Sequence, residues 1–269
     1  MNSIIGKGRT AIVYQYGDSC ALKLFNKGFE KMAEKEFKKT LILHRTGLPC
    51  PKVFKLLEQD GKKGIVYQCV KGESLFYHLK QCPFMVKKYA REMAQMHNKI
   101  HCYCGSELEE ICIQLANQIR NAPDLSISDK KQIIEYMDCL PDGNQVCHMD
   151  YHPDNIMFEQ GEISAVIDWS NSGRGNPLAD VCRTSILLRA ASSPPGTPLF
   201  WRMIIPVFGK VLNRLYLKAY CKQSGCTYYE ISQWTLPIAA ARLSEEIEKE
   251  REYLLNLIAR HLKKIENQR

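Results

Sequence analysis

The stretch Cys147-His148-Met149-Asp150-Tyr151-His152-Pro153-Asp154-Asn155, with Ile167-Asp168-Trp169 after it, decides the fold of this chain. It places an aspartate, an asparagine and a second aspartate in fixed order, with five residues from Asp150 to Asn155 and thirteen from Asn155 to Asp168. Phosphoryl transfer needs a carboxylate that orients and deprotonates the accepting hydroxyl, and oxygen ligands that hold Mg²⁺ on the nucleotide phosphates. The order His-x-Asp-x-x-x-x-Asn followed by a later Asp supplies these groups.

The residues around the motif predict a β-hairpin. Residues 156–158 are apolar, residues 159–162 form a turn, and residues 163–167 are apolar and mostly β-branched. Asn155 and Asp168 would then lie at the two bases of the hairpin as magnesium ligands, held more rigidly than on a loop. The alternative is an Asp-rich surface loop, which the combined order and spacing disfavour.

A glycine-bearing hairpin begins the chain. Residues 4–14 read as a strand, a loop with Gly6 and Gly8, and a second strand, so that backbone N–H groups can approach phosphates. A dinucleotide-binding fold needs a helix next, but Cys20–Phe25 reads as a further strand. The P-loop pattern is absent from the sequence as well. A hairpin that folds over nucleotide phosphates is the arrangement of kinases.

Lys23 lies in an otherwise apolar strand, where an unpaired ammonium is costly. Residues 29–45 predict a helix, and Glu36 falls on its apolar face. Glu36 is therefore the expected partner of Lys23, with Glu34 on the polar face as the second candidate. The alternative is that Lys23 extends to solvent at a sheet edge.

The strand over residues 64–70 is expected to be the last one before the linker to a second lobe. We expect main-chain groups near Gln68 and Val70 to recognise the adenine base. An ordinary edge strand remains the alternative.

With these residues in place, the chain resembles the aminoglycoside phosphotransferase and choline kinase family, which has the protein-kinase-like fold. The resemblance extends from residue 1 to about residue 183 and is most specific over residues 148–169. The segments that carry it are Gly6-Lys7-Gly8, Ala21-Leu22-Lys23-Leu24-Phe25, Glu36, Gly47-Leu48-Pro49-Cys50-Pro51-Lys52-Val53, His148 to Ile156, Ile167-Asp168-Trp169 and Asn176-Pro177-Leu178-Ala179-Asp180.

The resemblance implies an ATP-dependent, Mg²⁺-dependent kinase of a small-molecule hydroxyl. In that family pattern Asp150 is the catalytic base, Asn155 and Asp168 bind magnesium, and Lys23 binds the α- and β-phosphates. Asp180 supports the catalytic loop. The chain departs from the family at Asp154, where members usually have a small residue, and the C-terminal third matches no known acceptor site.

The expected fold class is α+β, with a small β-rich N-lobe over residues 1–70 and a larger helical C-lobe over residues 71–269. Helices are predicted over residues 85–100, 108–119, 203–222 and 235–264, and a loop over residues 192–198. Asp129 with Gln132 resembles a capping box.

The composition indicates a cytoplasmic enzyme. The 269 residues, 45% of them hydrophobic, can bury a substantial core. No leader is expected before the glycine loop at residue 6, and no apolar run approaches the ~20 residues of a membrane span. A net charge of +8 from Lys and Arg that alternate with Glu predicts solvated faces, with no nucleic-acid partner expected.

The twelve cysteines are expected to be reduced. A zinc site built from His97, His101, Cys102 and Cys104 is an alternative to the favoured interpretation, in which the two histidines lie one turn apart on a helix and the cysteines are small hydrophobes.

Two alternatives to a small-molecule kinase are a non-catalytic nucleotide-binding pseudokinase and a protein Ser/Thr kinase. Asp180 follows Asp168 after only twelve positions, which leaves little room for an activation segment, and Asp-Phe-Gly and Ala-Pro-Glu are absent.

The acceptor is expected to be a neutral or anionic hydroxyl compound, because residues 181–229 carry no acid and seven bases. The bases are Arg183, Arg189, Arg202, Lys210, Arg214, Lys218 and Lys222. The glutamates over residues 245–252 lie on a predicted helix with Lys249 and Arg251, so a solvated face with i,i+4 partners is one interpretation, and a helix that reaches the acceptor site is the alternative.

Overall fold

The computed structural model describes residues 3–59, 61–190 and 199–267, and the side chains of residues 199–205 and 266 are outside the description. The loop expected over residues 192–198 lies outside the described residues. Contacts divide the chain into two compact units. Unit 1 consists of Met1–Gln81 and Pro153–Ser172, and unit 2 of Cys82–His152 and Gly173–Arg269. The lobe boundary expected at residue 70 stays a prediction.

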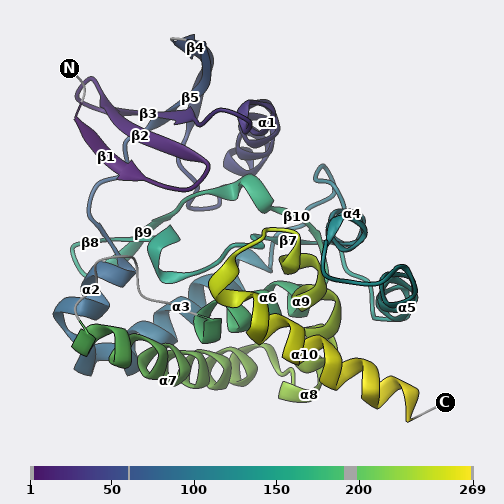
Figure 1. The fold of residues 1–269 in the computed structure, drawn as a ribbon. Helices are drawn as coiled ribbons and strands as arrows, with labels where there is room; N and C mark the ends of the chain where they lie inside the picture. Colours follow the sequence, from purple (N-terminus) through teal and green to yellow (C-terminus); the bar gives the residue numbers. More distant parts are fainter. Residues whose placement is uncertain (1–2, 60, 191–198, 268–269) are drawn as a thin grey trace. The chain divides into compact units, whose positions relative to one another are not determined.

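Unit 1 is built on a five-stranded antiparallel sheet with the strand order β1-β2-β3-β5-β4. The strands are β1 (Ile4–Lys7), β2 (Ala11–Tyr16), β3 (Cys20–Phe25), β4 (Val53–Gln59) and β5 (Lys62–Gln68). Helix α1 (Glu30–Arg45) lies beside this sheet (Figure 1). Burial drives the contact, because Phe25, Ile65 and Ala33 are fully buried in one apolar cluster.

The second part of unit 1 contains the predicted hairpin, which the structure confirms as β8 (Ile156–Glu159) and β9 (Glu162–Val166). β8 also pairs with the short β6 (Glu73–Ser74), which precedes α2 (Leu75–Gln81). Gly72 makes this pairing possible, since its φ is +93° and a Cβ there would lie 1.9 Å from the carbonyl oxygen of Phe158.

Unit 2 is mainly helical and confirms the α+β class. Its first part contains α3 (Val86–Ile100), α4 (Ile111–Asn121) and α5 (Ile127–Asp138). The short strands β7 (Gln145–Cys147) and β10 (Gly173–Gly175) pair with each other. The second part contains α6 (Pro177–Ala190), α7 (Leu199–Ser224), α8 (Tyr228–Gln233), α9 (Thr235–Leu243) and α10 (Glu248–Glu266). Helices α3 and α7 pack side by side (Figure 1).

Two local predictions are wrong. The single helix expected over residues 235–264 is interrupted between α9 and α10, where Glu246 has a φ of 52° that no right-handed helix accommodates. The helix α5 is capped by Ser126, whose hydroxyl accepts the N–H of Asp129, so Asp129 is the third helical residue and not the cap. No helix in the described ranges is both long and apolar enough to cross a bilayer.

Candidate active site

A buried ion pair in unit 1 joins β3 to α1. The Nζ atom of Lys23 lies 2.8 Å and 2.9 Å from the two carboxylate oxygens of Glu36, and 3.1 Å from Oδ1 of Asp168. Lys23 is 9% exposed and Glu36 is 2% exposed. Glu34, the second candidate, instead pairs with Lys63 at 2.5 Å on the surface. The structure therefore confirms the prediction that Glu36, on the apolar face of α1, is the partner of Lys23.

Tyr67 completes this cluster, and the sequence analysis missed it. Its hydroxyl donates to Oε1 of Glu36 at 2.6 Å. The sheet register explains the contact, because Tyr67 pairs with Ala21 and Ile65 pairs with Lys23, so these side chains share one face. Burial opposes the charge on Lys23, but the carboxylates of Glu36 and Asp168 prevail and raise the pKa of the ammonium above its usual value. A permanently charged lysine at this position is suited to bind phosphate oxygens.

Asn155 and Asp168 come together at the bases of the β8–β9 hairpin, because the N–H of Ile167 donates to the Asn155 carbonyl at 2.9 Å. Asp168 has a φ of 60°, an unfavourable conformation for a residue with a side chain, and such strain is concentrated at functional sites. Its Oδ1 also accepts the Ser170 hydroxyl at 2.9 Å. One carboxylate and one amide oxygen are ligands that Mg²⁺ prefers. With a third of its side chain exposed, Asp168 fits a magnesium site.

The glycine loop and the end of β5 are also in unit 1. A Cβ at Gly6 or Gly8 would meet nothing closer than 3.5 Å, so the fold itself does not demand glycine there, whereas close approach of a ligand would. Gln68 and Val70 line a pocket of about 260 Å³. The rest of its lining is Pro49, Cys50, Pro51, Cys69, Lys71, Glu159, Ser164 and Ala165.

The turn that carries Asp150 belongs to unit 2, and Asp180 of α6 holds it. Oδ2 of Asp180 accepts the N–H of His148 at 2.5 Å, and Oδ1 accepts the N–H of Met149 at 2.9 Å. Met149 has a φ of 60°, so these two bonds stabilise a strained backbone immediately before Asp150. The N–H of Asp150 points back to Nδ1 of His148 at 3.2 Å. Asp180 therefore fixes the direction in which the Asp150 side chain leaves the turn.

A network of two histidines and two tyrosines fixes Asp180 in turn. Nε2 of His97 and Nε2 of His101 lie 3.0 Å and 3.2 Å from Oδ2 of Asp180. Their Nδ1 atoms lie 2.6 Å from the Tyr216 hydroxyl and 2.7 Å from the Tyr220 hydroxyl. The pKa of His97 is lowered, so its ring is neutral and can donate from Nε2 to the carboxylate and accept the Tyr216 hydroxyl at Nδ1.

The same network bears on the zinc alternative. His97 and His101 are buried with Asp180 and Tyr216, whereas Cys102 and Cys104 are exposed. The four ligands of the zinc alternative are therefore not assembled, and the two cysteines are not core hydrophobes, as the favoured interpretation had them. Although two histidines and an aspartate can bind a metal ion, both nitrogens of each ring here have protein partners.

This network predicts a loss of stability in mild acid. Burial first, and then the neighbouring His101, lower the pKa of His97 from 6.5 to about 4, against the attraction of Asp180. Between these values the unfolded chain binds a proton that the folded chain does not, so the contribution is complete above pH 6.5 and is lost as the pH falls toward 4. We expect urea unfolding to show that wild type loses roughly 2 kcal/mol more than His97→Gln between pH 7 and pH 5. Equal losses would contradict a buried neutral His97.

Asp150 lies among positive groups of its own unit. Burial alone would raise the pKa of its carboxyl, but His152, 3.7 Å away, together with Arg183 and His148 holds this pKa well below its usual value. The side chain is therefore ionised at neutral pH. A carboxylate of such low basicity orients a hydroxyl and accepts its proton only as the oxygen begins to bond to phosphorus.

Beside Asp150 lies a buried ion network that joins α6, α9 and α10. Glu245 accepts from Arg183 at 2.5 Å and from Arg242 at 3.1 Å, and Glu250 binds Arg242 through two bonds of 2.6 Å and 2.9 Å. The interpretation of a solvated face is therefore wrong for Glu245 and Glu250. The break between α9 and α10 turns both carboxylates back toward Arg242, which lies on the preceding helix.

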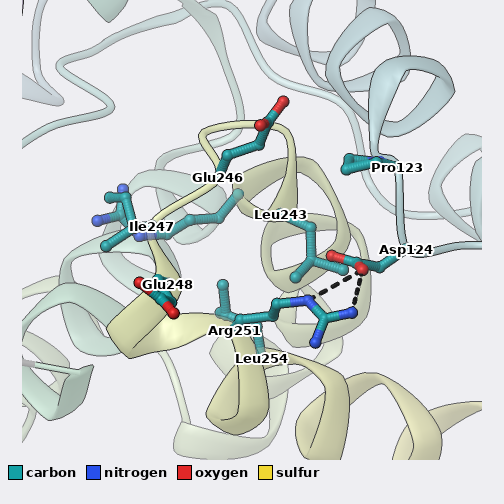
Figure 2. Close-up of a pocket in the computed structure, with 9 residues that line it drawn as sticks. Pro123, Asp124, Leu243, Glu246, Ile247, Glu248, Arg251 and Leu254 are labelled. Carbon is teal, nitrogen blue, oxygen red and sulfur yellow. Dashed lines mark hydrogen bonds and ion pairs between the residues drawn. The ribbon is translucent and has the colours of Figure 1, made fainter.

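Arg242 also lines a pocket of about 190 Å³ at that break (Figure 2). Asp124 and Arg251 form an ion pair across the pocket, with 2.9 Å between Oδ1 and Nε. Exposed Glu246 and Glu248 also line it. The remaining lining is Pro123, Leu243, Ile247 and Leu254. The charges in this pocket are therefore mixed.

Solved structures of known proteins share this fold. The crystal structure of an aminoglycoside-3'-phosphotransferase of type VIII matches with a TM-score of 0.61 and 16% identity, covering 91% of this chain and 93% of that chain. A thermostable mutant of aminoglycoside phosphotransferase APH(4)-Ia in its apo form gives 0.65 and 15%, covering 98% and 94%. A variant of that thermostable mutant with a further substitution, in ternary complex with AMP-PNP and hygromycin B, gives 0.62 and 15%, covering 96% and 89%.

Sequence comparison gives a relative and a family. Acyl-CoA dehydrogenase family member 10 of Mus musculus is 26% identical over 237 residues, which cover 77% of this chain. The chain spans about a fifth of that protein, 21% of its length. The model of the phosphotransferase enzyme family matches residues 3–202, which include every motif quoted above. The protein-kinase-like fold and the resemblance first seen around Asp150 are thus confirmed, and the chain belongs to the phosphotransferase enzyme family.

Proposed function

We propose that this protein is an ATP-dependent kinase that transfers the γ-phosphate to a hydroxyl of a small molecule. The observation that carries the proposal is the ammonium of Lys23, buried between the carboxylates of Glu36 and Asp168. A structural lysine needs one partner, whereas Lys23 has two, and the second, Asp168, keeps a third of its side chain exposed just after β9. Lys23 would exchange its contact with Asp168 for phosphate oxygens, while Glu36 and Tyr67 keep it in place.

The other unit 1 residues have roles that follow from their chemistry. Gly6 and Gly8 would leave room for phosphates, and main-chain groups near Gln68 and Val70 would bind the base. Asn155 and Asp168 would hold Mg²⁺, which supplies neutralising charge to the phosphate oxygens when bound. In unit 2, the ionised Asp150 would orient the acceptor hydroxyl and accept its proton, supported by Asp180.

A pseudokinase is disfavoured by the same residues. A binding scaffold has no need for a strained Met149 and for Asp150 held ionised among His152 and Arg183. A protein kinase is disfavoured by the segment between Asp168 and Asp180. In the structure it consists of a 3₁₀ turn (Trp169–Asn171), the short β10 and the first turn of α6. An activation segment that docks a peptide has no residues left to form it.

The charges around Asp150 bear on the class of the acceptor. The sequence suggested a surplus of positive charge over residues 181–229, but Arg183, the base of that stretch whose charge acts on Asp150, is paired with Glu245. Arg242, on α9, is paired with Glu245 and Glu250. Of the seven bases over residues 181–229, only the side chain of Arg202 lies outside the described part of the structure. A balanced network offers no excess of carboxylates to a polycation and no free cation to a strong anion. We therefore propose a neutral hydroxyl compound, such as a sugar or an uncharged alcohol.

An acceptor screen tests the proposal. Purified protein is incubated with Mg-ATP and single compounds, and ADP release is followed with sugars, amino alcohols, hydroxy acids and kanamycin-type aminoglycosides. We expect saturable stimulation by a neutral hydroxyl compound. Saturable phosphorylation of an aminoglycoside at micromolar concentration would overturn the choice of acceptor but support the kinase. No ADP release with any compound, despite magnesium-dependent ATP binding, would support the pseudokinase instead.

A further inference from the structure

The C-terminal end of α7 brings two cysteines into contact. Gly225 has a φ of +77°, and its N–H donates to the carbonyl of Cys221 at 3.0 Å, which is the bond of a left-handed helix cap. In such a cap, the side chain four residues before the glycine packs against the side chain of the residue after the glycine. This contact is usually apolar. Here the two residues are Cys221 and Cys226, and their sulfur atoms are 3.7 Å apart.

Local groups favour reaction between these sulfurs. A disulfide has a bond length of about 2.05 Å, so the sulfurs must approach by about 1.7 Å, which rotations about the two Cα–Cβ bonds can supply. The Ser224 hydroxyl lies 3.1 Å from Sγ of Cys226, where it can donate a hydrogen bond to a thiolate. Both cysteines are partly exposed, so a small oxidant can reach them.

We propose that Cys221 and Cys226 form a dithiol site that low-molecular-weight disulfides oxidise to an intramolecular disulfide. The thiolate of Cys226 attacks one sulfur of the oxidant, forming a mixed disulfide and releasing one thiolate. Cys221 then attacks Sγ of Cys226, and the second oxidant thiolate leaves. In total the two cysteines lose two electrons and two protons. The oxidant takes up these electrons and protons and leaves as two thiols.

The order of the two steps follows from the surroundings. Burial first, and then the neighbouring Cys226, raise the pKa of Cys221 to about 12, so Cys221 is a poor first nucleophile. Once Cys226 is capped, its charge no longer opposes ionisation of Cys221. The second step is also intramolecular, since the cap already holds the sulfurs together.

The disulfide would tie down the turn that supports the Asp150 loop. Tyr220 precedes Cys221, and its hydroxyl contacts His101, which contacts Asp180. Helix ends fray, and a covalent bond from residue 221 to residue 226 closes the last turn of α7. Because the reduced cap already has the required contact, the bond is expected to stabilise the folded state rather than distort it.

Peptide mapping tests the bond directly. The native protein is treated with oxidised glutathione, alkylated and digested with trypsin, which cleaves after Lys218, Lys222 and Arg242. We expect residues 219–222 and 223–242 to appear as one cross-linked species, and Cys226→Ser to abolish it. Exposed Cys102 and Cys104, together on residues 100–120, report whether oxidant reached the protein. Glutathione on Cys102 or Cys104, with Cys221 and Cys226 free or singly modified, would overturn the proposal.

Thermal unfolding tests whether the reduced cap is preformed. We expect oxidised wild type to melt roughly 4 °C above the reduced protein. Cys221→Ser treated with the same oxidant should show no such shift. An unchanged or lower midpoint in protein that mapping finds fully cross-linked would contradict a preformed dithiol site. Peptide mapping and thermal unfolding need no phosphate acceptor. Their results therefore test the dithiol site independently of the proposed kinase activity.

Discussion

Replacing Asp150 with asparagine is expected to lower turnover by about 10²–10⁴-fold while Mg-ATP affinity is retained, because the effect of a lost general base has this size. Asparagine keeps the shape of the side chain and cannot accept the hydroxyl proton. In the structure Asp150 is ionised among His152, Arg183 and His148, and its backbone is fixed through Asp180, so the substitution changes charge without releasing the turn. Turnover and isothermal calorimetry with ATP, each with and without magnesium, measure the two quantities.

Two further variants separate the possible causes of that loss. Asp168→Ala removes a proposed magnesium ligand, so it should weaken ATP binding in the presence of magnesium as well as turnover. Asp154→Asn is a matched control, since Asp154 is an exposed carboxylate within the same motif, and its turnover should stay close to wild type. Equal losses of ATP affinity in the Asp150 and Asp168 variants would refute the division of labour between the two aspartates.

Short-range patterns in the sequence predicted most of unit 1. The hairpin 156–167, the strand with Lys23 and the face of α1 that carries Glu36 depend on alternation and helical periodicity within a few residues. These patterns fix which side of an element a residue occupies. The Lys23–Glu36 pair followed because a charge on an apolar face needs a partner.

The contacts that the sequence did not predict join distant helices. His97 and His101 meet Tyr216 and Tyr220 across 119 residues, although each pair has the i,i+4 spacing of one helix face, a signal that could have suggested the match. Glu245 and Glu250 were misplaced for a different reason. Helical periodicity predicted one helix that continues through residues 244–247. In the structure the helix is interrupted there, where Glu246 has a left-handed conformation, and no residue type in this segment marks the break.

Removal of either member of the Lys23–Glu36 pair is the second change with a large expected effect. Breaking a buried ion pair costs about 3–5 kcal/mol, because the remaining charge loses its partner without regaining water. Lys23→Ala leaves Glu36 with the Tyr67 hydroxyl, and Glu36→Ala leaves Lys23 with Asp168. We therefore expect Glu36→Ala to weaken ATP binding and turnover less than Lys23→Ala, since the ammonium proposed to contact phosphate is still present.

The double variant shows whether Lys23 and Glu36 act together or independently. If Lys23 acts only while Glu36 positions it, the turnover of the double variant should be little lower than that of Lys23→Ala alone. The loss of stability in the double variant should fall well below the sum of the losses in the two single variants. Tyr67→Phe should resemble a mild Glu36→Ala, raising the KM for ATP with a smaller effect on stability. Glu34→Ala is the control, because its surface pair with Lys63 should matter little. Additive losses in the double variant would mean that Glu36 only packs, and that Asp168 alone positions Lys23 toward the nucleotide.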